Sequence, residues 1–135
     1  MFIDSNIFLY ALSVGGKKEE KCRAFLDKIA KGEQNSVISA LVLDEIAWVI
    51  SEKGGEMAAI KTWEKVMTIP NLKIIEINES VVRSVPFFLK QGLDPRDAIH
   101  AATIRRQEDI CSAGMAKGLE RLIQARQRRL PLRRL

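Results

Sequence analysis

The sequence is poor in the features that mark membrane and secreted proteins. Its longest uninterrupted apolar run is 7–12, far shorter than the roughly 20 residues that a membrane helix needs. Asp4 stands in the apolar start where a secretory signal would carry Lys or Arg, and no small-residue cleavage site follows. We therefore expect neither a membrane span nor a cleaved leader.

Cysteine and histidine are also scarce. The chain has two cysteines, Cys22 and Cys111, with no CxxC spacing, whereas small disulfide-linked domains use cysteine much more densely. We predict reduced thiols in a cytoplasmic protein. The single histidine, His100, excludes the usual zinc sites, because structural zinc takes four Cys or His ligands. Any metal must be held by oxygen ligands.

The positive charge is concentrated at the end of the chain. Residues 123–135 hold five of the 22 basic residues and none of the 17 acidic ones, so the remainder is neutral despite a net charge of +5. Charge alone therefore does not indicate a nucleic-acid partner. With 135 residues, 47% of them hydrophobic, we predict a single domain over 1–122 followed by an Arg-rich tail over 123–135.

Short apolar segments alternate with segments of helical periodicity. The predicted strands are 2–4, 37–39, 72–77 and 110–112, and the predicted helices are 5–12, one ending at Gly32, 40–54, 56–68, 79–90 and one beginning at Asp94-Pro95. Ser5 or Asn6 is expected to cap the first helix, and Pro86 to bend or split its own. The pattern predicts an α/β fold, a three-layer α/β/α sandwich with a central, mostly parallel sheet.

Three acidic residues fall where such a fold binds ligands. Asp4 ends the first strand, Glu45 follows Ser39 by one and a half helical turns, and Asp97 lies in the first turn of its helix. Ligands of open parallel sheets bind beyond the carboxyl ends of the strands. Neighbouring acids without basic partners resist ionisation unless a cation neutralises them, and oxygen ligands select Mg²⁺ or Mn²⁺. Such a site activates water for attack on a phosphoryl group.

Each of these residues also has a purely structural interpretation. Asp4 is a possible cap of the helix that it precedes, and Asp97 suits the positive end of a helix dipole. His100, on the same helical face as Asp97, is either a general base or a packed core residue. Trp48 and Trp63 lie on apolar helix faces, which predicts core positions rather than base-stacking platforms.

Three segments resemble the PIN domain, in particular the VapC-like toxins of toxin and antitoxin pairs. They are Phe2-Ile3-Asp4-Ser5-Asn6-Ile7, Ser39-Ala40-Leu41-Val42-Leu43-Asp44-Glu45-Ile46, and the segment from Gly92 to Thr103 that contains Asp94-Pro95-Arg96-Asp97. The resemblance covers about residues 1–112. It implies an α/β/α sandwich and a Mg²⁺- or Mn²⁺-dependent ribonuclease that cleaves single-stranded RNA, often as a homodimer and often inhibited by a small antitoxin protein.

The same resemblance implies roles for six residues. Asp4, Glu45 and Asp97 would be catalytic metal ligands, Ser5 and Asn6 would orient the first carboxylate, and Ser39 would lie near the site. Asp44 is expected on the solvent face, in contrast to Glu45. A phospho-acceptor receiver domain, which also places acids at strand ends, would need paired acids where Ser5 and Asn6 follow Asp4.

The sequence departs from the family pattern after the predicted fourth strand. The family has a fourth acidic residue where this chain has Gly114. Three explanations stay open. The first is that Glu108, Asp109 or Glu120 takes the place of this acid by another route, and the second is that three ligands suffice to hold the metal. The third is that the protein is a degenerate member of the family that binds RNA or a partner protein. The end of the chain is compatible with a last strand at 121–123. It is also compatible with a helix, because Leu119, Leu122, Ile123 and Leu130 keep helical spacing.

Overall fold

The computed structural model describes residues 1–13 and 15–110, and it divides into two compact units. The first unit is Met1–Ile75 and the second begins at Glu76. The predictions that concern Cys111, Gly114, the helix or strand near the C-terminus and the tail at 123–135 lie outside the described residues. The single domain over 1–122 stays a prediction.

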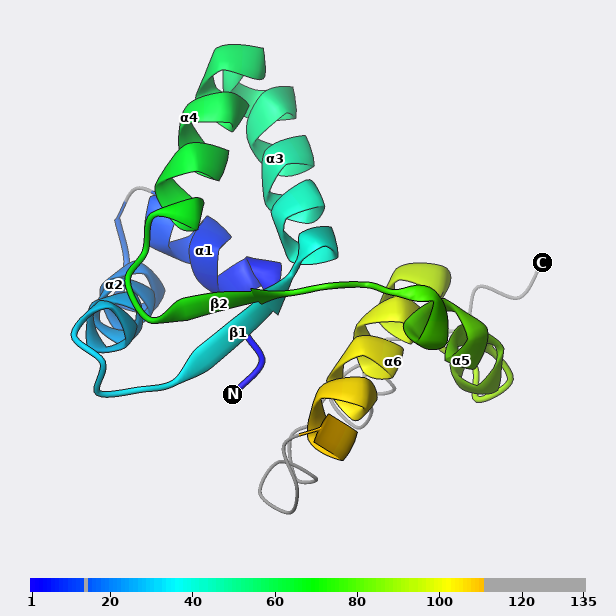
Figure 1. The fold of residues 1–135 in the computed structure, drawn as a ribbon. Helices are drawn as coiled ribbons and strands as arrows, with labels where there is room; N and C mark the ends of the chain where they lie inside the picture. Colours follow the sequence, from blue (N-terminus) through cyan, green and yellow to red (C-terminus); the bar gives the residue numbers. More distant parts are fainter. Residues whose placement is uncertain (14, 111–135) are drawn as a thin grey trace. The chain divides into compact units, whose positions relative to one another are not determined.

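The first unit joins a small parallel sheet to four helices (Figure 1). β1 pairs in parallel with β2 in a register that places Ser36 opposite Leu72 and Ser39 opposite Ile75. On the other side of β1, Phe2 forms a parallel bridge with Val37. The elements of this unit are α1 (Ser5–Leu12), α2 (Lys17–Ala30), β1 (Ser36–Ser39), α3 (Ala40–Gly54), α4 (Glu56–Met67) and β2 (Leu72–Ile75).

This arrangement confirms the predicted α/β class with parallel strands. A parallel connection needs a crossover segment, usually a helix, and the helices of the first unit lie between its strands in sequence. All four residues of β1 are buried, as expected for a strand with a neighbour on each side.

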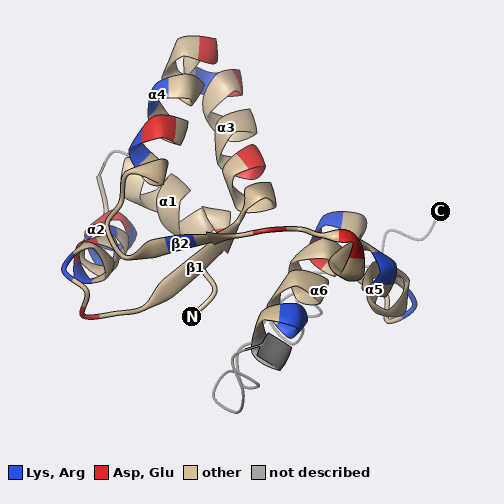
Figure 2. Ribbon diagram, in the orientation of Figure 1, with Lys and Arg blue, Asp and Glu red and all other residues tan. Residues whose placement is uncertain are grey.

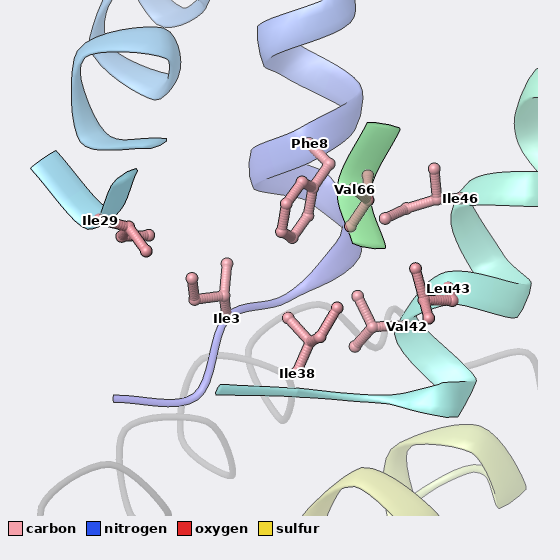
Figure 3. Close-up of a cluster of buried hydrophobic side chains, with 8 residues drawn as sticks. All are labelled: Ile3, Phe8, Ile29, Ile38, Val42, Leu43, Ile46 and Val66. Carbon is pink, nitrogen blue, oxygen red and sulfur yellow. The ribbon is translucent and has the colours of Figure 1, made fainter. Parts of the chain in front are cut away.

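The hydrophobic core of the first unit lies between one face of the sheet and helices α1, α2, α3 and α4. Figure 3 shows the side chains of Ile3 and Ile38 pointing toward Phe8, which is 2% exposed. Helix α3 contributes Val42, Leu43 and Ile46, spaced three and four residues apart as one helical face requires, and Ile29 of α2 and Val66 of α4 complete the cluster.

Helices α3 and α4 are joined by a single residue. Gly55, with φ 81° and ψ 174°, lies between the end of α3 and the start of α4. This backbone conformation is essentially restricted to glycine. The predicted boundary at 54–55 is thereby confirmed, and it lets the two helices pack side by side (Figure 1).

The described part of the second unit is a pair of helices, α5 (Glu79–Leu89) and α6 (Pro95–Ile110), which pack against each other. Its core consists of Val81 and Phe88 from α5 and three alanines of α6. Asn78 caps α5, since its side chain accepts a hydrogen bond from the Val81 N–H at 3.2 Å. Small alanines on one helix let the larger side chains of the other approach closely.

Several local predictions were wrong. The residue at the N-cap of α1 is Asp4, while Ser5 and Asn6 lie inside the helix. Pro86 does not split its helix, because α5 runs continuously from Glu79 to Leu89; a bend at Pro86 stays a prediction. Ile110, expected in a strand, is the last residue of α6. Trp48 and Trp63 are not core residues; they are 57% and 37% exposed.

Among the helices of the described ranges, none combines the length and apolar character needed to cross a membrane. Cys22, for which a reduced thiol was predicted, is buried and free.

Candidate metal centre at the end of the sheet

The predicted site begins where the N-terminal segment, which is bridged to β1 at Phe2, becomes helix α1. Ile3 N–H donates to the Val37 carbonyl at 3.0 Å, and Val37 N–H donates to the Met1 carbonyl at 2.8 Å. These two bonds fix the register of the first segment on β1. Because Phe2 pairs with Val37, Asp4 and Ser39 come two residues later on neighbouring parallel chains.

Asp4 and Ser39 therefore lie side by side at the carboxyl edge of the sheet. Both residues have extended backbone conformations and occupy the N-cap positions of α1 and α3. Side chains alternate along an extended chain, so these two point away from the face on which Ile3 and Ile38 form the core. Two helix N-termini thus meet at one edge, and their partial positive charge favours an anionic side chain there.

The Asp4 carboxylate is held in place by its own helix. Ser5 Oγ donates to one oxygen at 3.2 Å, and Asn6 Nδ2 donates to the other at 3.0 Å. The Asp4 side chain makes no capping hydrogen bond to α1, so helix capping does not explain why an acidic residue stands at this position. Each oxygen receives one hydrogen bond from a side chain in the first turn of α1.

Ser39 carries a second unusual feature. It is fully buried, and among the described residues its hydroxyl has no hydrogen-bond partner. A buried hydroxyl without a partner costs free energy. An oxygen or water brought to this edge by a ligand would satisfy it.

Glu45 lies in the second turn of α3, six residues beyond Ser39, and is partly buried. Its neighbour Asp44 is exposed, as predicted. Helix α3 packs against α1 and β1, so the first unit brings Glu45 to the same group of elements as Asp4 and Ser39.

Asp97 belongs to the second unit. Its backbone N–H donates to Asp94 Oδ1 at 3.0 Å, so Asp94 caps α6, and Pro95 is the first residue of the helix. Asp97 is 8% exposed, and His100 and Thr103, on the same side of α6, are also buried. Asp97 is therefore an acid in a buried helical stripe rather than a solvated first-turn residue.

The donor chemistry of these residues suits a hard divalent cation. Carboxylate oxygens are the ligands that Mg²⁺ and Mn²⁺ prefer, and Mg²⁺ is commonly held by one or two carboxylates with water completing its shell. The oriented carboxylate of Asp4 and the buried hydroxyl of Ser39 fit such a hydrated ion. Within the described ranges, however, no three His, Cys, Asp or Glu side chains form a group that would hold a metal ion. The triad of Asp4, Glu45 and Asp97 remains a prediction.

Sequence reasoning missed one surface altogether. Trp48 and Trp63, expected in the core, line a groove between α3 and α4. Periodicity identified the apolar faces of these helices but carried no signal of how far each face is covered.

Comparison with known proteins agrees with the geometry. The PIN domain model matches residues 1–111. Among solved structures, the toxin VapC20 of Mycobacterium tuberculosis, described as cleaving the sarcin-ricin loop, matches with a TM-score of 0.61 and 13% sequence identity, over 78% of this chain and 82% of that one. Among curated proteins, none matches the sequence. At this identity the structural likeness concerns the fold, and the family match covers the three segments that resemble PIN domains. The chain belongs to the PIN domain family.

Proposed function

We propose that the protein is a metal-dependent endoribonuclease that hydrolyses phosphodiester bonds of single-stranded RNA. The observation that carries the proposal is the Asp4 carboxylate, fixed by Ser5 and Asn6 at the sheet edge beside the Ser39 hydroxyl. A carboxylate used only for capping would bind the helix N–H groups, and this one does not. Membership of the PIN family supports the reaction class.

Asp4, Glu45 and Asp97 would hold Mg²⁺ or Mn²⁺. When bound, such an ion lowers the pKa of water and stabilises charge on the phosphoryl group. Ser5 and Asn6 keep both oxygens of Asp4 in one orientation, which limits the entropy lost on ligand binding. Ser39 would orient water at the edge of the sheet.

The proposal extends to a toxin of a toxin and antitoxin pair, acting in the cytoplasm as a homodimer and inhibited by a small antitoxin protein. The support is the family resemblance and the PIN-like fold shared with VapC20, which is itself described as a toxin that cleaves the sarcin-ricin loop. RNA as the substrate class follows from the same likeness.

A second function competes with this one. Gly114 stands where the family has its fourth acid, and the described residues form no group of three that would hold a metal. These observations favour a degenerate PIN protein that binds RNA or a partner protein without cleaving it.

Cleavage of an end-labelled single-stranded RNA mixture separates the two functions. We expect cutting with Mg²⁺ or Mn²⁺ and none with EDTA. Loss of a residue that only supports a metal ligand usually lowers metal affinity or activity by about 10–100-fold. Asp97→Asn and Glu45→Gln each remove a proposed direct ligand, so each should lower the rate of RNA cleavage by more than about 100-fold. Glu52→Gln is the matched control, because Glu52 is an exposed acid on the same helix as Glu45.

Equal cutting by the wild type and Asp97→Asn would show that the activity does not belong to this site. No metal-dependent cutting by the wild type would reject the nuclease in favour of the binding function. Activity gained by Gly114→Asp would then identify the missing acid as the cause.

A further inference from the structure

Helix α5 presents an aromatic ring to solvent. Phe87 is 53% exposed. The adjacent Phe88, whose ring meets that of Phe87 edge to face at 5.2 Å between ring centres, is buried in the core of the second unit. A single exposed apolar side chain is ordinary on a protein surface. The charged residues next to Phe87 distinguish it from such a side chain.

Three basic residues border this ring. The guanidinium carbon of Arg105 in α6 lies 5.1 Å from the centre of the Phe87 ring, within the range of a cation–π contact. Along α5, Arg83 precedes Phe87 by four residues and Lys90 follows it by three, so both lie on the same side of the helix. All three basic residues are exposed. We call Arg83, Phe87, Lys90 and Arg105 the aromatic–basic patch.

The patch carries more positive than negative charge. Glu79 is the one acidic residue in the sequence of α5, and it forms an ion pair with Arg83. Lys90 and Arg105 add two further positive charges beside the ring, and Figure 2 shows basic segments on both α5 and α6. A second copy of the same patch would bring like charges together, which is unfavourable. A polyanion that carries flat apolar groups suits this surface better.

We propose that the aromatic–basic patch binds single-stranded RNA, with one base stacked on Phe87 and neighbouring phosphates held by Lys90 and Arg105. Proteins that bind single strands combine aromatic stacking platforms with positive charge along the backbone. Asp97 and Arg105 lie eight residues apart on α6, about 12 Å along the helix axis. The patch therefore holds the strand close to one of the predicted metal ligands. The choice of RNA rests on the proposed function.

Binding without cleavage tests the stacked base. The probe is a fluorescein-labelled oligoadenylate of about 12 nucleotides, and its anisotropy is measured in EDTA. Because each stacked base contributes substantially to affinity, Phe87→Ala should raise the Kd at least about fivefold, and Phe87→Trp should restore it. Val82→Ala is the matched control and should leave the Kd unchanged. Val82 is 57% exposed on the same helix, but it lies on a different side.

An abasic oligomer with the same ribose-phosphate backbone separates stacking from charge. It should bind the wild type and Phe87→Ala equally, because it has no base to stack. Circular dichroism and the midpoint of urea unfolding check that each variant is folded.

The salt dependence of the Kd tests the basic residues. Each phosphate contact made by Lys or Arg adds about 0.7 to the slope of log Kd against log salt for a single strand. Lys90→Ala and Arg105→Ala should each lower this slope by about that amount. Arg106→Ala is the matched control, because adjacent residues of a helix do not face the same side, and it should leave the slope unchanged.

An unchanged Kd in Phe87→Ala would overturn the proposal, and so would an equal loss of affinity in Val82→Ala. A dimer that dissociates in Phe87→Ala during sedimentation, with RNA affinity unchanged, would assign the patch to a second copy of the chain instead. Metal-dependent cleavage by a protein whose Kd does not respond to Phe87→Ala would reject the patch and keep the nuclease. The reverse result, binding that depends on Phe87 without any cleavage, would keep the patch and reject the nuclease.

Discussion

The cap of helix α6 links stability to the proposed site, and its removal has a predictable cost. Asp94 Oδ1 accepts the backbone N–H of Asp97 at 3.0 Å, so the bond fixes the turn that carries the third predicted ligand. Replacing a capping Asp by Ala typically costs about 1 kcal/mol. For a chain of 135 residues, this corresponds to a decrease in Tm of roughly 3–5 °C.

Scanning calorimetry of Asp94→Ala and Asp94→Asn provides the assay. Asparagine keeps an acceptor oxygen of the same length, so Asp94→Asn should retain most of the stability that Asp94→Ala loses. Asn78→Ala is the matched control in the other helix of the pair, since Asn78 caps α5 by the same kind of bond, at 3.2 Å.

RNA cleavage then distinguishes a general loss of stability from a local one. Asp94→Ala should lower cleavage by about tenfold at a temperature where the protein is folded, because outer-shell changes commonly cost 10-fold or more. Asn78→Ala should lower Tm by a similar amount with cleavage unchanged. A wild-type Tm for Asp94→Ala would refute the capping argument. Equal loss of cleavage in Asp94→Ala and Asn78→Ala would refute the link to the site.

Three further predictions follow from contacts in the two units. Asn6→Ala removes the hydrogen bond from Asn6 Nδ2 to Asp4 Oδ2 and should raise the Mg²⁺ concentration needed for half-maximal cleavage by about 10–100-fold, with Tm nearly unchanged. Phe88→Ala should destabilise the protein by about 3–5 kcal/mol in urea unfolding, whereas the adjacent Phe87→Ala should cost less than about 1 kcal/mol, because Phe88 is 1% exposed and Phe87 53%. Ser36→Ala and Ser39→Ala each remove a buried hydroxyl without a hydrogen-bond partner among the described residues, so neither should lower Tm. Only Ser39→Ala should lower cleavage, and equal cleavage by the two serine variants would contradict the role given to Ser39.

Local signals in the sequence predicted most of the element boundaries. Gly55 and Asp94 act through their own backbone and nearest turn, so the end of α3 and the start of α6 were correctly placed. Asp4 was expected at the end of a strand over 2–4, but this segment forms only an isolated parallel bridge at Phe2, and Asp4 follows it by two residues. The capping residue of α1 was misplaced, because Asp4, Ser5 and Asn6 are all good capping residues and composition does not rank them.

The continuity of α5 at Pro86 illustrates a different limit. Proline removes one backbone N–H and clashes with the preceding turn, which predicted a bend or a split. The helix is nevertheless continuous, and Phe88, two residues further on, is buried against α6. Packing of the side chains beyond Pro86 outweighs the lost bond, and that packing depends on a partner helix that local sequence does not reveal.

The proposed metal site and the groove between α3 and α4 differ in how far local sequence could predict them. Asp4 and Ser39 are placed together by strand register, which the alternation of strands and helices already implies. Asp97 belongs to the second unit, so its predicted role rests on the family pattern. Trp48 and Trp63 have the periodicity of core residues, yet α3 and α4 cover only the stripe that contains Ala59 and Val66. Helical periodicity identifies an apolar face, but the extent to which that face is covered depends on contacts that local sequence does not reveal, and for this reason the exposure of the two tryptophans could not be predicted.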